Sequence, residues 1–453
     1  MRLFLVNPPS FSKNLAPLPP AGLAYIAAFV RENGYDVDML DAMNLGLDHA
    51  QTVARVRSSQ PDLVGISVVS GTHNSSVMLG KLLHEALPQA KIVLGGPHVH
   101  FLYQQIMQEH AWINFCVRGE GEHTTLELLS ALERGTDLSG IPGLVHRING
   151  RLLVNQDRPF IKDLDNLPFP ARDLLPMYAY YWRIFGFTRP DDKVVTITAT
   201  RGCPFHCHFC ASSYLWKVQR RRSVENVLDE IGKCSREYDV GMLLFPDDLL
   251  LLNEKWAIRL CQGMIERGYD RFKWACMGRP GRMSANMLDW LEKARCGLIM
   301  YGIEFGNQRL LNFCDKKTTL PDIESTIAAT RARGILTMGF FILGYPTETV
   351  ETIEQTIQFA QELKLDYAEF NLPKALPGSP LHDYCLERDL LIDTSDQNYS
   401  SVSTQMIALE NVTPAELARL YRKALKRTRY SFAGRLKKFA RRMLLRRATH
   451  KLS

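Results

Sequence analysis

Three cysteines near the middle of the chain have the spacing of iron–sulfur or metal ligands. Residues 200–210 read TRGCPFHCHFC, which places Cys203, Cys207 and Cys210 in one short segment. Cysteine thiolates are the usual protein ligands of iron–sulfur clusters. Three thiolates would bind three irons of a cubane and leave the fourth iron open to a substrate or cofactor. The spacing therefore predicts a redox-active cluster with one open iron.

Two other interpretations of these cysteines stay open at this point. Zinc could be bound by the cysteines together with His206 or His208, because cysteine and histidine are the usual zinc ligands. The three thiols could also be unligated, since free cysteine is often a small buried hydrophobe. No second cysteine pair at zinc-finger spacing lies nearby, and this favours the cluster.

The whole motif resembles that of the radical S-adenosylmethionine superfamily. Its pattern is Cys-x3-Cys-x2-Cys with an aromatic residue, here Phe209, before the last cysteine. The resemblance implies that the three cysteines hold a [4Fe-4S] cluster whose open iron chelates S-adenosylmethionine. An electron from the cluster would then cleave this cofactor to a 5′-deoxyadenosyl radical, which abstracts a substrate hydrogen. An external one-electron reductant of the flavodoxin or ferredoxin type is implied as well.

Later segments extend the resemblance to about residue 400. The segments 245–248, 302–306, 343–349 and 377–380 match it in position and order. The resemblance implies S-adenosylmethionine contacts at Phe209, Pro246, Asp247, Asp248, Arg279, Glu304 and Gly344.

Some of these polar residues also have structural interpretations. Asp247 and Asp248 could lie in a solvated loop. Glu304 ends an apolar strand and needs a partner, for which a ribose hydroxyl or an ammonium group would serve. The three arginines at 220–222 could form a solvated entry into a helix capped by Ser223, or they could screen anionic substrate groups.

The first 135 residues alternate short apolar runs with helical patterns. We expect strands at Leu3–Val6, Val37–Leu40, Leu63–Val68, Ile92–Leu94 and Ile113–Val117. We expect helices near Ala21–Glu32, Ala50–Ser58, Ser75–Leu87 and Phe101–Glu109, and another after Glu122. This rhythm predicts a doubly wound parallel sheet over residues 1–135, with ligands beyond the carboxyl ends of the strands.

Small and polar residues gather at those strand ends. They are similar to the motifs of the superfamily branch with an N-terminal cobalamin domain, which includes anaerobic methyltransferases and the oxygen-independent Mg-protoporphyrin cyclase. The resemblance implies cobalamin contacts at Asn7, Pro8, Pro9, Gly22, Ser67, Gly95, Gly96, His98, Gly119, Glu120, Gly121 and Glu122. Glycine would let the backbone approach a flat macrocycle closely. The chain has no Asp-x-His-x-x-Gly motif, so the lower axial ligand of cobalt stays open. The alternative is a degenerate domain that only packs against the second half.

The remainder divides into three parts. Residues 136–190 form a hairpin and linker, because Val145–Ile148 and Arg151–Val154 flank the turn pair Asn149-Gly150. For residues 191–400 we expect an incomplete (βα)6 barrel. Its strands are expected at Val194–Thr198, Met242–Phe245, Lys273–Cys276, Ile299–Glu304, Met338–Leu343 and Tyr367–Leu372. Residues 401–453 form a helical C-terminal region with a basic tail. The fold class is therefore α/β.

Composition points to a soluble cytoplasmic protein. The 453 residues are 46% apolar and 23% charged, and ten cysteines are spread over a chain that begins without a signal-peptide pattern. We therefore expect a reducing compartment and give the seven isolated cysteines no ligand role. No run approaches the ~18 apolar residues that a membrane span needs.

The basic charge is confined to the C-terminus. Residues 422–453 hold 13 Lys and Arg and no acidic residue, which leaves 42 basic against 48 acidic residues before them. Phe432, Leu436, Phe439 and Met443 would line one face of a helix. Such a helix predicts peripheral contact with the inner membrane surface, or docking on the acidic body of the protein. We expect no nucleic-acid partner, because no RNA-binding module is evident.

The resemblance implies methyl transfer to an unactivated carbon of a small-molecule or lipid substrate. One alternative keeps both cofactors but ends in cyclisation, ring rearrangement or oxidation. Another is a non-catalytic iron–sulfur protein for electron transfer or sensing. The three clustered cysteines argue against it, since such proteins normally shield every iron with a protein ligand.

Overall fold

The first sheet contains five parallel strands, as expected from the alternating pattern. The computed structural model describes residues 1–11, 18–184 and 186–428. The parallel strands are β1 (Arg2–Asn7), β2 (Asp36–Asp41), β3 (Leu63–Ser67), β4 (Lys91–Gly95) and β5 (Phe115–Val117). The sheet order β2-β1-β3-β4-β5 reverses direction between β1 and β3, which confirms the doubly wound prediction.

The expected hairpin extends this first sheet. β6 (Leu144–Ile148) and β7 (Arg151–Val154) are joined by the Asn149-Gly150 turn, in which both residues have positive φ. β6 pairs antiparallel with β5, and β7 pairs with β6. Five parallel strands and a two-stranded antiparallel edge therefore make up the N-terminal layer.

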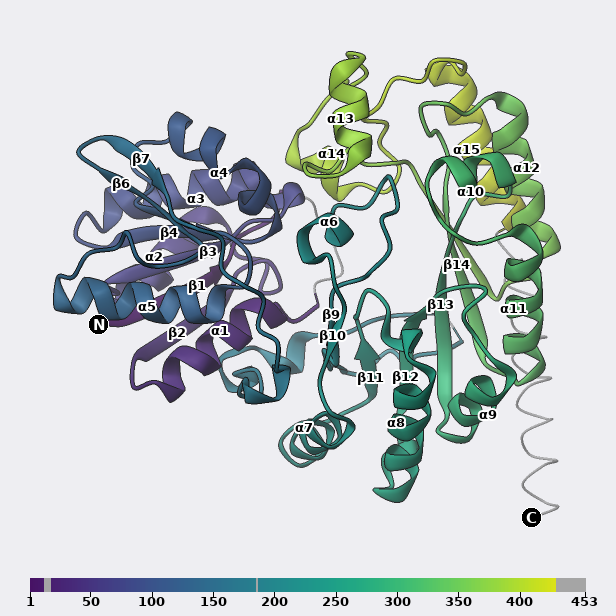
Figure 1. The fold of residues 1–453 in the computed structure, drawn as a ribbon, viewed down its shortest axis with the longest axis horizontal. Coiled ribbons are helices and arrows are strands. Elements are labelled where there is room, and N and C mark those ends of the chain that lie inside the picture. Colours follow the sequence, from purple (N-terminus) through teal and green to yellow (C-terminus); the bar gives the residue numbers. More distant parts are fainter. Residues whose placement is uncertain (12–17, 185, 429–453) are drawn as a thin grey trace.

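Helices cover both faces of the first sheet (Figure 1). α1 (Ala21–Glu32) and α5 (Gly121–Arg134) pack together on one face, and α2 (His49–Ser59) and α3 (His73–Ala86) pack together on the other. α4 (Pro97–Glu109) lies against β4 and β5. It begins four residues before the expected Phe101, because Pro97 occupies a first-turn position where its missing N–H costs nothing.

The second sheet is an open parallel barrel, which confirms the predicted fold class. Its strands are β8 (Val194–Thr196), β11 (Met242–Phe245), β12 (Lys273–Gly278), β13 (Cys296–Glu304), β14 (Leu336–Ile342) and β15 (Tyr367–Asn371). They neighbour one another in chain order, so β8 and β15 are the two edge strands of this sheet. The longer connecting helices are α7 (Val224–Glu237), α8 (Glu254–Glu266), α9 (Ala285–Lys293), α11 (Leu320–Ala332) and α12 (Val350–Glu362).

Side-chain caps start most of these barrel helices. Ser223 accepts a hydrogen bond from the backbone amide of Asn226 at 3.1 Å. It is therefore the N-cap of α7, and it directly follows the arginine run 220–222. Ser284, Thr319 and Thr349 cap α9, α11 and α12 in the same way. Each cap satisfies an amide that the helix leaves unpaired.

Shorter elements lie at the carboxyl ends of the barrel strands. β9 (Thr200–Arg201) and β10 (Arg220–Arg221) form a two-stranded ribbon, and we call residues 202–219 between them the cysteine loop. This loop contains α6 (Ser212–Trp216), which lies beside α4 of the N-terminal layer. α10 (Gln308–Phe313) follows β13.

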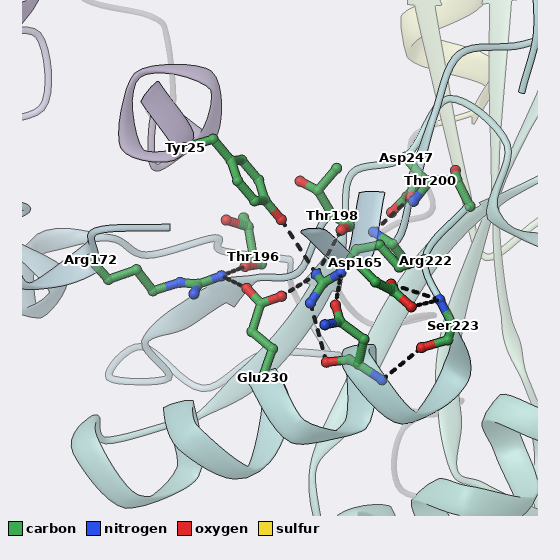
Figure 2. Close-up of polar contacts among 12 residues, drawn as sticks. Tyr25, Asp165, Arg172, Thr196, Thr198, Thr200, Arg222, Ser223, Glu230 and Asp247 are labelled. Carbon is green, nitrogen blue, oxygen red and sulfur yellow. Dashed lines mark hydrogen bonds and ion pairs between the residues drawn. The ribbon is translucent and has the colours of Figure 1, made fainter. Parts of the chain in front are cut away.

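A buried polar network anchors the linker to the barrel (Figure 2). Arg172 and Arg222 both ion-pair with Glu230 of α7, and all three side chains are buried. Arg172 also donates to the carbonyl of Thr196 at 2.7 Å, and Arg222 donates to the carbonyl of Thr198 at 3.0 Å. Around this network one hydrophobic core runs from the first sheet through the linker into the barrel. The two layers are therefore packed together through a shared core.

The C-terminal segment returns over the top of the molecule (Figure 1). It contains α13 (Pro380–Glu387), α14 (Asp396–Ser400) and α15 (Pro414–Thr428). Asp396 accepts hydrogen bonds from the backbone of Asn74 and Ser75 at 2.9 Å, which ties α14 to the N-terminal layer. The predicted amphipathic helix around Phe432–Met443 lies outside the described residues. Between residues 1 and 428, apart from the two undescribed gaps, no helix has the length and apolarity of a membrane span.

Candidate active site between the two sheets

One cavity lies where the carboxyl edge of the first sheet meets the barrel. Its empty volume is about 1370 Å³ and includes space open to solvent. Ser67 and Gly95 line it from the ends of β3 and β4, and Thr198 and Asp247 line it from the barrel. The sequence predicts ligand sites at the strand ends of both sheets, and residues from both sets of strand ends line this cavity. Of the expected S-adenosylmethionine contacts, Pro246, Asp247 and Asp248 belong to the lining, whereas the following expected site residues lie outside it: Phe209, Arg279, Glu304, Gly344, Cys203, Cys207 and Cys210.

Glycines form much of the N-terminal wall of this cavity. Gly22 and Gly119 have no atom within 4 Å of where a Cβ would stand, so a side chain there would project into open space. Gly119 has φ +75°, which favours glycine. At Gly96 a Cβ would lie 2.6 Å from the carbonyl oxygen of Val68, so this glycine is required by the backbone itself. The wall is therefore smooth enough for a flat ligand to approach the backbone.

Asp247 lines the cavity from the barrel side. It is 3% exposed, and its Oδ1 accepts hydrogen bonds from the backbone amides of Ala199, at 3.0 Å, and of Thr200 (Figure 2). Its Oδ2 has no hydrogen-bond partner in the described structure. Burial raises the pKa of Asp247 to about 7, against the opposing effect of its contacts with Thr200, through both side chain and amide, and with the amide of Ala199. Asp247 therefore holds the strand that leads to the cysteines and keeps a second oxygen for a ligand.

The neighbouring carboxylate, Asp248, is exposed and also lines the cavity. Ser212 at the start of α6 donates a hydrogen bond to its Oδ2 at 2.6 Å. Leu215 and Trp216 of the same helix add an apolar surface to the cavity. Pro246 completes this side.

The three cysteines lie in the cysteine loop as free thiols. Cys207 is buried, while Cys203 and Cys210 are half-buried, and burial raises the pKa of both half-buried thiols. Among the described residues, no group of three or more His, Cys, Asp or Glu side chains converges on a single metal ion. A cubane cluster does not require its ligands to converge on one ion, because each cysteine binds a different iron.

A buried arginine faces these thiols. The guanidinium of Arg279 lies 3.6 Å from the ring centroid of Phe205, and its Nη1 is 4.0 Å from the sulfur of Cys207. Its Nε and Nη2 are buried without a hydrogen-bond partner in the described structure. A buried cation with free donors beside the Cys207 thiol fits an anionic ligand, because a buried polar group normally has a partner. The thiols and Arg279 together fit an iron–sulfur cluster with a bound carboxylate-bearing cofactor.

Glu304 and Gly344 end the neighbouring strands in unusual backbone conformations. Glu304 has φ +67°, a conformation that costs energy for any residue with a side chain and that is common at functional sites. Its carboxylate pairs with the buried Lys316 at 2.7 Å, and the Lys316 ammonium lies 5.8 Å from the ring centroid of Phe209. Gly344 has φ +87° and donates its amide to Glu348 at 2.7 Å.

Several expected cobalamin contacts lie away from the cavity. Asn7 donates to Asp41 at 2.7 Å, and Pro8 and Pro9 follow it outside the cavity lining. His98 is buried within 3.1 Å of the Ser70 hydroxyl and against the ring of His73. Burial lowers the pKa of His98 to about 3, so its ring is neutral at pH 7.

Other residues of the lining were not anticipated. His100 lines the cavity and accepts the amide of Gly119 at 3.2 Å. The expected contacts in this segment ended at His98, and no motif singled out His100. Glu120 and Glu122, which were expected contacts, also line the cavity. Their carboxylates form ion pairs with Arg201.

Comparison with known proteins supports this arrangement. The B12 binding domain family matches residues 14–129, and the Radical SAM superfamily matches residues 197–360. The chain is 34% identical over 429 residues to a Pyrococcus horikoshii protein named as an uncharacterized methyltransferase, covering 94% of this chain and 91% of that protein. It is 30% identical over 388 residues to the anaerobic magnesium-protoporphyrin IX monomethyl ester cyclase of Cereibacter sphaeroides, covering 84% of this chain and 62% of the cyclase.

A solved structure shares the fold over most of the chain. The radical S-adenosylmethionine methyltransferase TsrM from Kitasatospora setae, with cobalamin and its cluster bound, superimposes with a TM-score of 0.70 at 20% identity. The match covers 93% of this chain and 81% of TsrM. With both family domains present in this order and a 34% identical relative over nearly its whole length, the chain belongs to the radical S-adenosylmethionine superfamily, in the branch of enzymes with an N-terminal cobalamin-binding domain.

Proposed function

We propose that this enzyme transfers a methyl group to an unactivated carbon of a small-molecule substrate. The observation that carries the proposal is the single cavity, which is lined both by the glycine wall of the N-terminal sheet and by Asp247 at the base of the cysteine loop. Methyl transfer requires the two cofactor sites to face the same substrate. When bound, the cluster and S-adenosylmethionine supply the substrate-activating radical, and cobalamin supplies the methyl group.

In this proposal Cys203, Cys207 and Cys210 are the three cluster ligands. They are free thiols on one loop, and Arg279 stands beside Cys207 as a buried cation. The two free nitrogens of Arg279 would bind the carboxylate of S-adenosylmethionine. Phe209, Pro246, Asp248 and Gly344 would line the same site, and Glu304 would accept a ribose hydroxyl or the amino group.

Asp247 would hold a proton at the border of the two sites. Its raised pKa of about 7 allows the side chain to be neutral near neutral pH. The unpartnered Oδ2 can then donate a hydrogen bond to an acceptor in the cavity. Asp247→Asn should preserve this donor and both amide contacts.

The N-terminal wall would hold cobalamin. Gly22, Ser67, Gly95, Gly96, Gly119 and Gly121 line it without large side chains. His98 lies outside the lining, so the proposal gives it no contact with cobalt. The open space beside Gly22 and Gly119 supports a bulky ligand close to the backbone there.

Relative lengths favour methyl transfer over cyclisation. The chain spans 91% of the protein named as a methyltransferase but only 62% of the cyclase, so over a third of the cyclase has no counterpart here. A cyclase without methyl transfer is the second candidate, because its identity to this chain is nearly as high.

Two measurements test the proposal. Anaerobically reconstituted enzyme should hold one cluster and one cobalamin per chain, and it should form 5′-deoxyadenosine when flavodoxin or ferredoxin supplies electrons. Incubation with S-adenosylmethionine carrying a labelled methyl group should then place the label in a product heavier by one methyl group. A labelled cofactor pool with an unlabelled product would favour the cyclase candidate.

The basic tail supports a further part of the proposal. Its 13 basic residues and the apolar stripe Phe432, Leu436, Phe439 and Met443 would bring the enzyme to an anionic membrane surface. A lipid or other apolar substrate would then be within reach of the cavity.

A further inference from the structure

The base of the cysteine loop is fixed by the ribbon of β9 and β10. Arg201 pairs directly opposite Arg220 across this ribbon. Gly202 follows at φ +89°, where a Cβ would overlap the carbonyl oxygen of Val218 at the other end of the loop. The two ends of the loop therefore move together, and Arg201 is only two residues from Cys203.

Both ribbon arginines reach across to the N-terminal layer. Arg201 donates to Glu120 and to Glu122, each at 2.7 Å, and Arg220 donates to the second oxygen of Glu120 at 2.7 Å. We call these four residues the interdomain bridge. It joins the cysteine loop to the start of α5, next to the glycine wall.

Burial makes the geometry of this bridge specific. The side chains of Glu120 and Glu122 are 2% and 3% exposed, and those of Arg201 and Arg220 are 13% and 9% exposed. Removing one member of a buried ion pair leaves an uncompensated charge, which is strongly unfavourable. The bridge therefore holds its two sides in one relative position.

The bridge ends at the wall of the cavity. Glu120, Glu122 and Arg201 line the cavity themselves, and Gly121 lies between the two carboxylates. Arg220 stands behind them, with its guanidinium 4.7 Å from the ring centroid of Phe160 and a hydrogen bond to the Ile161 carbonyl at 2.8 Å. A change at the base of the cysteine loop is thus passed to the cobalamin side of the cavity.

We propose that the interdomain bridge couples the two cofactor sites. A cluster that orders the cysteine loop fixes Arg201 and Arg220, and these in turn fix Glu120 and Glu122 in the wall that receives cobalamin. Coupling of this kind is reciprocal, so bound cobalamin also stabilises the loop that holds the cluster. This inference rests on the proposed function. Arg220 is its positioning residue, since it does not line the cavity.

The test is the affinity for hydroxocobalamin before and after reconstitution of the cluster in the full-length protein. For wild type we expect the dissociation constant to fall at least about fivefold on reconstitution, the lower end of typical coupling. Arg220→Met removes the charge while keeping a long side chain, and its two dissociation constants should agree. Arg220→Lys keeps the pair with Glu120 and should restore the difference.

Arg31→Met is the matched control, because Arg31 pairs with Asp173 in an exposed bridge between the N-terminal layer and the linker. In this variant the dissociation constant for hydroxocobalamin should fall on reconstitution by the same factor as in wild type. Hydrogen exchange gives a second readout that needs no variant: reconstitution alone should slow exchange of the amides at 119–122. The coupling would be overturned if reconstitution changed neither the hydroxocobalamin affinity nor the amide exchange of the wild-type protein. It would also be overturned if Arg220→Met showed the full wild-type change in affinity. If wild type bound no hydroxocobalamin in either form, both the coupling and the cobalamin part of the proposed function would fail.

Discussion

Replacing Asp247 with Asn should change how the stability of the cofactor-free protein depends on pH. The ordinary pKa of an aspartate is 3.8, and burial raises that of Asp247 to about 7. Between these two values the folded protein keeps a proton that the unfolded chain has lost. The free energy of unfolding must therefore fall as pH rises from about 4 to about 7, and it is constant again above that range. Asn carries no titrating proton, so this loss disappears in the variant.

The magnitude follows from the size of the shift. One pKa unit corresponds to about 1.4 kcal/mol, so the full shift is worth about 4 kcal/mol. Between pH 5 and pH 8 the contribution of Asp247 should decrease the free energy of unfolding by about 2–3 kcal/mol. Asn also keeps an oxygen for the amides of Ala199 and Thr200, so the local structure is retained.

Urea unfolding at pH 5 and pH 8 measures this effect. The difference in unfolding free energy between Asp247→Asn and wild type should shift by about 2–3 kcal/mol in favour of the variant at the higher pH. Asp248→Asn makes the same charge change at the exposed neighbouring position and serves as the matched control. If the Asp247→Asn difference is the same at both pH values, Asp247 does not bind a proton in the folded state and the argument is wrong.

Three further predictions concern the cofactor sites and the tail. Replacing Cys203, Cys207 or Cys210 with Ala should abolish cluster assembly and S-adenosylmethionine cleavage, whereas Cys234→Ala should keep full iron content. An iron-replete triple variant would contradict this assignment. Gly22→Leu projects into open cavity space, so it should weaken hydroxocobalamin binding at least tenfold, about 1.4 kcal/mol or more, with iron content unchanged. Equal binding by the variant and wild type would refute the glycine-wall site. Truncation after Thr428 should reduce sedimentation with anionic vesicles. This cut keeps all of α15, including the Lys423 pair with Glu354, and equal pelleting of both proteins would remove the membrane proposal.

Local patterns were sufficient to predict the strands of the two large sheets and the helices named for the N-terminal layer, but not the short ribbon of β9 and β10 or the short helices α6 and α10. α1 spans Ala21–Glu32 as expected, because its apolar residues recur at helical spacing and face the sheet. All thirteen strands that were expected in the two large sheets occur at or within a few residues of their predicted positions. Their order follows from the βα rhythm, since parallel neighbours need crossover helices. The boundary of α4 was wrong because a proline that starts a helix was taken for a loop residue.

The composition of the site was harder to predict than its location. Ser67, Gly95 and Asp247, which were chosen because they follow strands, all line the cavity, since the carboxyl edge of a sheet is fixed once its strands are known. They also suggested His98, which the structure turns toward Ser70 and His73. A strand end locates a loop but leaves the direction of each side chain to tertiary packing.

The partners of buried charges could not be predicted from local sequence at all. Glu120 and Arg220 are a hundred residues apart, and neither has an ionic partner near it along the chain. The arginine run at 220–222 was interpreted as a solvated helix entry or as a screen for anionic groups. In the structure, Arg220 and Arg222 each neutralise a buried carboxylate from a different part of the fold. Glu120 would be costly to bury without them, because an unpaired carboxylate in the interior is strongly unfavourable. The buried position of Glu120 in the N-terminal layer therefore depends on the ribbon that supports the cysteine loop.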